Sequence, residues 1–181
     1  MNQYDFVVIG SGPAGRRAAI QAAKLEKKAL VIEKGTRVGG VSVHTGTIPS
    51  KTLRETALNL TGWRERGFYG RSYRVKQEIS ADDLRRRLLI TLDHEVEVLE
   101  HQFSRNRVHQ MRGTAHFIDA HTLEVVKEDG EVVHVQAGSV LLAVGTRPFK
   151  PSHIPFDGVS IIDSDRSEEH TSELQSQDLI S

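Results

Sequence analysis

Cysteine is absent from all 181 residues of the sequence. A disulfide needs two thiols, and many structural zinc sites need thiolate ligands, so the chain can form neither. Thiol–disulfide exchange proceeds by attack of a thiolate on a disulfide sulfur, and it is excluded for the same reason. The chain therefore has no thiol-based redox chemistry of its own.

Long apolar runs and an excess of one charge are missing as well. No apolar stretch approaches the roughly 20 residues that span a membrane, and no basic-then-apolar leader opens the chain. The 24 basic and 24 acidic residues balance, which gives no electrostatic reason to expect nucleic acid or an anionic membrane as a partner. An apolar content of 38% is enough for a core. We expect a soluble, cytoplasmic protein.

The N-terminal part of the chain contains one strand–helix–strand unit. Residues 5–9 (DFVVI) and 29–32 (ALVI) are short, continuous apolar runs, as expected for strands buried on both faces. Residues 13–27 between them have apolar side chains at helical spacing. This order predicts two parallel strands joined by a right-handed crossover.

A glycine motif lies at the turn between the first strand and the helix. Gly10, Gly12 and Gly15 form G-x-G-x-x-G: the first permits a tight turn, the second lets backbone approach a pyrophosphate, and the third allows close helix–strand packing. Pro13 suits a first helical position. Glu33 ends the second strand, where a carboxylate can accept hydrogen bonds from ribose hydroxyls. Together these features predict dinucleotide binding, the phosphates resting on the helix start.

Two further helices are expected. One covers residues 50–66. The other follows Ser80-Ala81-Asp82-Asp83, which is like a capping box, and has apolar side chains every three or four residues as far as Phe103. The arginine run at 85–87 invites a phosphate-binding or nucleic-acid interpretation, but three consecutive helical side chains point in different directions, and a solvated face is favoured.

Beyond residue 108 the apolar period changes to two. Strands expected at 122–126 and 131–135 flank Asp129-Gly130, a hairpin turn sequence, and residues 139–144 (SVLLAV) form another apolar strand.

None of the nine histidines has the spacing of a metal motif. His94 and His101 are seven residues apart on the long helix, without an accompanying H-E-x-x-H or carboxylate pattern, so we expect no metal site. His44 lies in the loop discussed below, where packing is its expected role.

Residues 166–176 (RSEEHTSELQS) match the translation of a widely used sequencing-adapter oligonucleotide. A natural polar tail is the alternative, because Ser, Glu and Gln are common in disordered ends. We expect residues 166–181 to be an adapter-derived tail and residues 1–165 to be native sequence.

Residues 39–51 (GGVSVHTGTIPSK) resemble the redox loop of the flavoprotein disulfide reductases, the family of lipoamide dehydrogenase and glutathione reductase. That family has a GG pair, two cysteines five residues apart and then I-P-S-K; here Ser42 and Thr47 stand at the cysteine positions. The glycine motif and A-x-G-x-R-P at 143–148 fit the same family. The resemblance covers residues 4–165.

The resemblance implies an α/β fold, a Rossmann-type FAD-binding domain with a parallel sheet, helices and an antiparallel β-meander. In relatives this domain is discontinuous, and residues 1–165 would be its N-terminal part. FAD is the implied cofactor, and a C-terminal region absent here would bind NAD(P). The intact protein is expected to be a homodimer and this fragment alone to be inactive.

The resemblance also implies which residues contact FAD: Gly10, Gly12, Pro13, Ala14, Gly15, Glu33, Lys34, Gly39, Gly40, Val41, Ser42, Gly46, Thr47, Lys51, Gly113, Thr114, Ala115, Ala143, Gly145, Thr146 and Arg147. Lys51 would lie near the reactive edge of the flavin, where a cation stabilises charge on the reduced ring; a solvated lysine is the alternative. Ser42, Val43 and Thr47 would line the ring without sulfur chemistry.

Three functions remain open. Residues 46–55 (GTIPSKTLRE) are most similar to family members that lack the redox disulfide and pass hydride from NADPH through FAD to NAD⁺, or in reverse. Those members usually keep the first cysteine, so Ser42 is a departure. Another FAD-dependent NAD(P)H reductase without the disulfide is the second possibility. A stand-alone, non-catalytic FAD-binding module is the third.

Overall fold

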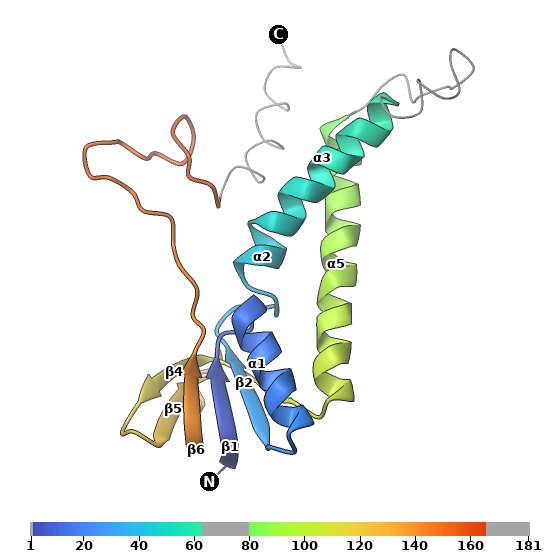
Figure 1. Cartoon of the computed structure of the whole chain (residues 1–181). Helices are drawn as coiled ribbons and strands as arrows, with labels where there is room; N and C mark the ends of the chain where they lie inside the picture. Colours follow the sequence, from blue (N-terminus) through green and yellow to red (C-terminus); the bar gives the residue numbers. More distant parts are fainter. Residues whose placement is uncertain (1, 63–79, 166–181) are drawn as a thin grey trace. The chain divides into compact units, whose positions relative to one another are not determined.

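The computed structural model describes residues 2–62 and 80–165 (Figure 1). The adapter-like tail and the end of the helix expected at 50–66 lie outside the described residues. The chain divides into two compact units, one of Met1–Ser42 with Glu95–Thr146 and one of Val43–His94 with Arg147–Ser181.

The first unit is built on a six-stranded sheet. Its strands are β1 (Asn2–Ile9), β2 (Ala29–Glu33), β3 (His109–Arg112), β4 (Thr114–Phe117), β5 (Thr122–Val126) and β6 (Val132–Leu142), arranged in the order β3-β2-β1-β6-β5-β4. The pairs β3–β2, β2–β1 and β1–β6 are parallel, whereas the pairs β6–β5 and β5–β4 are antiparallel. The expected Rossmann-type sheet with a β-meander is confirmed.

Strand β6 belongs to both parts of the sheet. The sequence predicts separate strands at 131–135 and 139–144, but the structure has one strand, Val132–Leu142. Its residues 132–136 pair with β5, and its residues from Val135 to Leu142 pair with β1. The apolar alternation breaks at Gly138, yet pairing with β1 continues on both sides of it. A Cβ at this position would lie 2.9 Å from the carbonyl oxygen of Asp5. Glycine permits this close approach of β6 to β1.

Helix α1 (Pro13–Lys24) follows β1 and covers β1 and β2 (Figure 1). It ends three residues before the predicted boundary, because Glu26 adopts a left-handed conformation (φ 61°) and Lys27 N–H donates to the Ala22 carbonyl. Those features form a Schellman motif, which stops a helix. The buried side chains of Ala19 on α1 and Val8 and Val31 on the strands belong to this helical layer.

A second group of buried residues, apart from the layer under α1, lies between the parallel strands and the meander. One buried apolar cluster joins Tyr4, Val7, Leu30, Ile32, Leu123, Val125, Val135 and Ala137. Since inward-facing strand residues alternate, the apolar runs of β1 and β2 can serve this core and the helical layer at once. Burying both faces of the parallel strands holds the carboxyl ends of β1 and β2 in place.

The remaining helices within the described residues are α2 (Val41–His44), α3 (Thr47–Thr61) and α5 (Ala81–Arg105). Helix α3 begins at Thr47 rather than the expected Ser50, because Pro49 falls in the first turn, where its missing N–H would have no helical partner. The predicted cap of α5 is confirmed: Ser80 Oγ donates to Asp83 Oδ2 over 2.9 Å, and Asp83 N–H donates to Ser80 Oγ over 3.3 Å. Within the first unit α5 contributes the buried residues Val96, Leu99 and Phe103.

Candidate dinucleotide site at the β1–α1 turn

Each glycine of the motif meets a different environment at the turn between β1 and α1. Gly10 has φ 104°, and a Cβ there would collide with the Ala143 carbonyl oxygen; a Cβ on Gly15 would collide with the Gly10 carbonyl oxygen. A Cβ on Gly12 would meet nothing within 4 Å. Gly10 and Gly15 are therefore required by packing, whereas Gly12 leaves open space above the start of α1. Phosphate binding at a helix N-terminus needs both features, a tightly packed turn and open space next to the helix start.

A buried serine ties this turn to the end of β2. Ser11 is fully buried, its Oγ donates to Glu33 Oε2 over 2.5 Å, and its N–H donates to the same oxygen over 2.9 Å. The other carboxylate oxygen of Glu33 accepts from Gly35 N–H over 2.8 Å. Gly39 N–H in turn donates to Ser11 Oγ over 2.9 Å. Three segments that are distant in sequence thus share one hydrogen-bond network.

These bonds also set the charge state of Glu33. Burial by itself would raise the pKa of this carboxyl, but the bonds from the Ser11 hydroxyl, Gly35 N–H and Ser11 N–H, with the positive charge of Lys34, lower the pKa below its ordinary value. Hydrogen bonds to the charged form favour that form. Glu33 is therefore an ionised acceptor at neutral pH.

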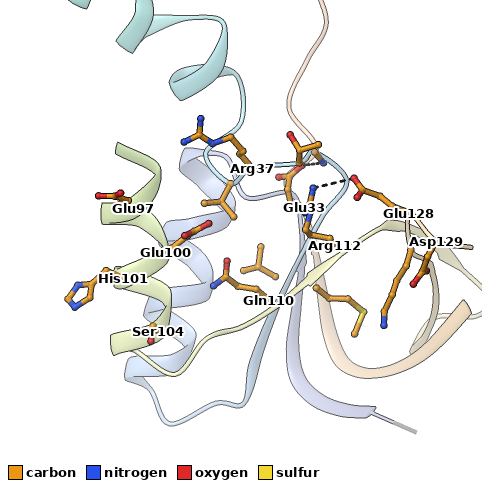
Figure 2. Close-up of a pocket in the computed structure, with 16 residues that line it drawn as sticks. Glu33, Arg37, Glu97, Glu100, His101, Ser104, Gln110, Arg112, Glu128 and Asp129 are labelled. Atoms are coloured by element: carbon orange, nitrogen blue, oxygen red, sulfur yellow. Dashed lines mark hydrogen bonds and ion pairs between the residues drawn. The ribbon is translucent and has the colours of Figure 1, made fainter. Parts of the chain in front are cut away.

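A cavity of about 1030 Å³ opens beside Glu33. Figure 2 shows Glu33, Arg112 and Glu128 on one side of it and Glu97, Glu100, His101 and Ser104 of α5 on the other. An ion pair of 3.3 Å joins Arg112 at the end of β3 to Glu128 of the β5–β6 turn (Figure 2). The cavity lies at the carboxyl ends of β2 and β3, where open α/β sheets bind their ligands.

The residues present fit a dinucleotide cofactor. The open space at Gly12 admits a pyrophosphate, and Gly40, whose added Cβ would lie 3.0 Å from Gly12 Cα, brings a second glycine backbone against the turn. Glu33 Oε2 accepts two hydrogen bonds, whereas Oε1 accepts one from Gly35. A carboxylate oxygen has two lone pairs, so Oε1 can still accept a hydroxyl. The adjoining cavity is of the size that small-molecule sites have.

Two later segments with expected residues reach the ends of β1 and β2. Gly113 N–H donates to the Glu33 carbonyl over 2.9 Å, and Ala143 N–H donates to the Ile9 carbonyl over 2.8 Å, which brings both later segments to the ends of β1 and β2. Ser42 Oγ donates to the Gly39 carbonyl over 3.2 Å. The first unit also contains the expected residues Pro13, Ala14, Lys34, Val41, Thr114, Ala115, Gly145 and Thr146.

Four expected residues belong to the second unit: Gly46, Thr47, Lys51 and Arg147. Thr47 and Lys51 are exposed there, and their contact with a flavin stays a prediction. Ser11 and the Arg112–Glu128 pair were missed by sequence reasoning. Ser11 occupies a variable position of G-x-G, and only its polarity between two glycines could have drawn attention to it. Nothing in the local sequence relates Arg112 to Glu128.

Over the described ranges 2–62 and 80–165, no group of three or more His, Asp or Glu side chains is placed to hold a metal ion. Helices long and apolar enough to cross a membrane are likewise absent from that part of the chain.

Comparison with known proteins agrees with the fold and the turn. The family model described as pyridine nucleotide-disulphide oxidoreductase matches residues 4–180. The soluble pyridine nucleotide transhydrogenase of Mycobacterium tuberculosis (strain H37Ra) is 48% identical over 166 residues, covering 91% of this chain and 36% of the relative. That of Colwellia psychrerythraea is 37% identical, covering 90% of this chain and 34% of the relative. The chain thus spans about a third of the length of these relatives.

Two solved structures share the fold. The Cu(II) complex of the HOCl-induced flavoprotein disulfide reductase RclA from Escherichia coli has a TM-score of 0.69 at 23% identity, over 84% of this chain and 31% of that one. The Cu(II) complex of a cysteine-to-serine mutant of the same reductase has a TM-score of 0.72 at 23% identity, over 93% of this chain and 34% of that one. With the family match over nearly its whole length, this chain belongs to the pyridine nucleotide-disulphide oxidoreductase family.

Proposed function

We propose that this chain is the N-terminal part of a discontinuous FAD-binding domain in a protein that transfers hydride between NADPH and NAD⁺. The observation that carries the proposal is the β1–α1 turn, with space at Gly12 and an ionised Glu33 beside it. It occurs in a chain 48% identical to a protein named soluble pyridine nucleotide transhydrogenase.

The binding roles follow from charge and backbone geometry. Backbone N–H groups at the start of α1 would hold the FAD pyrophosphate, because they and the helix dipole favour an anion. Glu33 would accept a ribose hydroxyl through Oε1. The cavity next to it, walled by α5 and the Arg112–Glu128 pair, would receive the adenosine end of the cofactor.

Bound FAD would supply the hydride chemistry, accepting hydride from a reduced nicotinamide and passing it to an oxidised one. The chain's own loop contributes no thiol, since Ser42 and Thr47 stand at the two cysteine positions of the family. Ser42 instead holds the loop through its bond to the Gly39 carbonyl. Lys51 would place a positive charge near the flavin.

The nicotinamide site would belong to sequence that the relatives have and this chain lacks. A homodimer is implied by the resemblance to the flavoprotein disulfide reductases. The word soluble in the relatives' names supports the cytoplasm as the location.

The test uses the intact protein that contains this chain. Purified with FAD, it should reduce thio-NAD⁺ with NADPH as donor, followed by the absorbance of the reduced analogue. The Ser42→Cys variant should keep the rate within about twofold, because one thiol restores no disulfide and transfer through flavin needs none. Reduction of FAD by NADPH without transfer to thio-NAD⁺ would refute the transhydrogenase and favour another flavin reductase.

A further inference from the structure

We propose that the hollow between α1 and α5 is a second anion site, for a small oligophosphate. We call it the α1 basic cleft. It has a volume of about 500 Å³ and is lined by Arg16, Arg17, Ile20, Gln21, Lys24 and Gln102. All six residues belong to the first unit. Neither the family resemblance nor the proposed function uses any of them.

Helix geometry directs the α1 residues to one side. Arg17, Gln21 and Lys24 are spaced i, i+4 and i+7, so they lie above one another on one face of the helix. Arg16 and Ile20 form the adjacent row with the same four-residue spacing. Gln102 of α5 closes the cleft from the other side. The site therefore combines residues of two helices that are far apart in the sequence.

The positive charge in the cleft is not compensated by neighbouring acids. No carboxylate lines it, and the α1 sequence PAGRRAAIQAAK contains no acidic residue. Across residues 2–62 and 80–165, the side chains of Arg16, Arg17 and Lys24 have no ion-pair or hydrogen-bond partner. Two other cations of the first unit are paired with acids: Arg112 with Glu128 at 3.3 Å and Lys127 with Glu131 at 2.6 Å. Three unpaired cations around one hollow favour an anion.

The donors suit phosphoryl oxygens. Each arginine offers a planar fork that can bind a phosphate through two hydrogen bonds, Lys24 adds a compact charge, and the two glutamine amides add neutral donors. The volume is within the range of small-molecule sites. The dinucleotide turn is separate, because its glycines lie at the start of α1 whereas the cleft extends along the side of the helix as far as Lys24.

Isothermal titration of the full 181-residue chain with tripolyphosphate tests the site. The double variant R17Q/K24Q should bind at least about tenfold more weakly, because two of three cations are lost. The matched control is R85Q/R87Q, which removes two exposed cations from α5 without changing the cleft. It should stay within about twofold of the parent chain, apart from general screening effects.

A third variant separates the cleft from the dinucleotide turn. Gly12→Val fills the open space at the start of α1 and should leave tripolyphosphate binding by the cleft in place. The proposal is overturned if the parent chain does not bind, if Gly12→Val abolishes binding, or if the two double variants weaken it equally. In the last case tripolyphosphate binding would depend only on the net charge of the chain and not on the cleft.

Discussion

Ser11 Oγ donates to Glu33 Oε2 over 2.5 Å and accepts from Gly39 N–H over 2.9 Å, from a position with no solvent exposure. One hydroxyl thus connects the β1–α1 turn, the end of β2 and the loop that carries Gly39 and Gly40. The network fixes the acceptor carboxylate and the glycine backbones around the space where we place the FAD pyrophosphate. Stability and cofactor binding should therefore depend on the same side chains.

Ser11→Ala should destabilise the chain by about 2 kcal/mol, because it leaves the Gly39 N–H unpaired and removes a bond to an ionised carboxylate. Urea unfolding followed by circular dichroism measures the loss. Ser104→Ala is the control: Ser104 is an exposed serine of α5, and the change should stay within about 0.5 kcal/mol. Equal stability of the two variants would contradict the role given to Ser11.

Gly10→Ala should lower the free energy of unfolding by more than the positive φ of Gly10 alone explains. At φ 104° an alanine is strained, and its Cβ would also collide with the Ala143 carbonyl. Gly130→Ala provides the comparison, because Gly130 has φ 83° and open space around its Cβ. We expect about 1 kcal/mol of destabilisation at Gly130 and at least about twice that at Gly10. Equal losses at the two positions would mean that β6 does not pack against the turn.

Glu33 should make the stability of the chain depend on acid pH. Its folded pKa is lowered relative to the ordinary value of 4.5, so the unfolded state binds the proton more readily. The resulting stability is present above the unfolded pKa and is lost as the pH falls through the lowered, folded pKa.

The pH effect is measured as the free energy of unfolding at a series of pH values from neutral to acid, for the parent chain and for the Glu33→Gln variant. The variant should be less stable at neutral pH by about 2 kcal/mol and lose less on acidification. Glu100→Gln alters an exposed carboxylate on the same cavity and should follow the parent curve. If the free energy of unfolding fell with pH in parallel for Glu33→Gln and the parent chain, the lowered pKa of Glu33 would be refuted.

Much of the fold could be predicted because its signals are local. The apolar runs of β1 and β2, the glycines between them and the Ser80–Asp83 cap each act over a few residues, and each was found where expected. The hairpin at Asp129-Gly130 is local too: Gly130 has φ 83°, and Gly130 N–H donates to the Lys127 carbonyl.

The failures involve contacts between distant segments. Gly138 breaks the apolar pattern within β6, and only its closeness to Asp5 shows why the strand continues. Ser11 became part of the site through Glu33 and Gly39, which are 22 and 28 residues away. The cavity beside Glu33 combines α5, β3 and the β5–β6 turn. Local periodicity contains no information about such pairings.

Gly12→Ala in the intact protein tests most directly whether the β1–α1 turn holds FAD. The position has φ −62° and free space for a Cβ. It is also the N-cap of α1, where alanine is less favourable than glycine, so alanine should lower the unfolding free energy of the apoprotein by no more than about 1 kcal/mol. The same methyl group would occupy the pyrophosphate space. The amount of FAD that stays bound to the protein after gel filtration is measured by its absorbance, and it should fall. The unfolding free energy of the apoprotein, measured alongside, should change little. Unchanged FAD content at unchanged stability would contradict the proposed site.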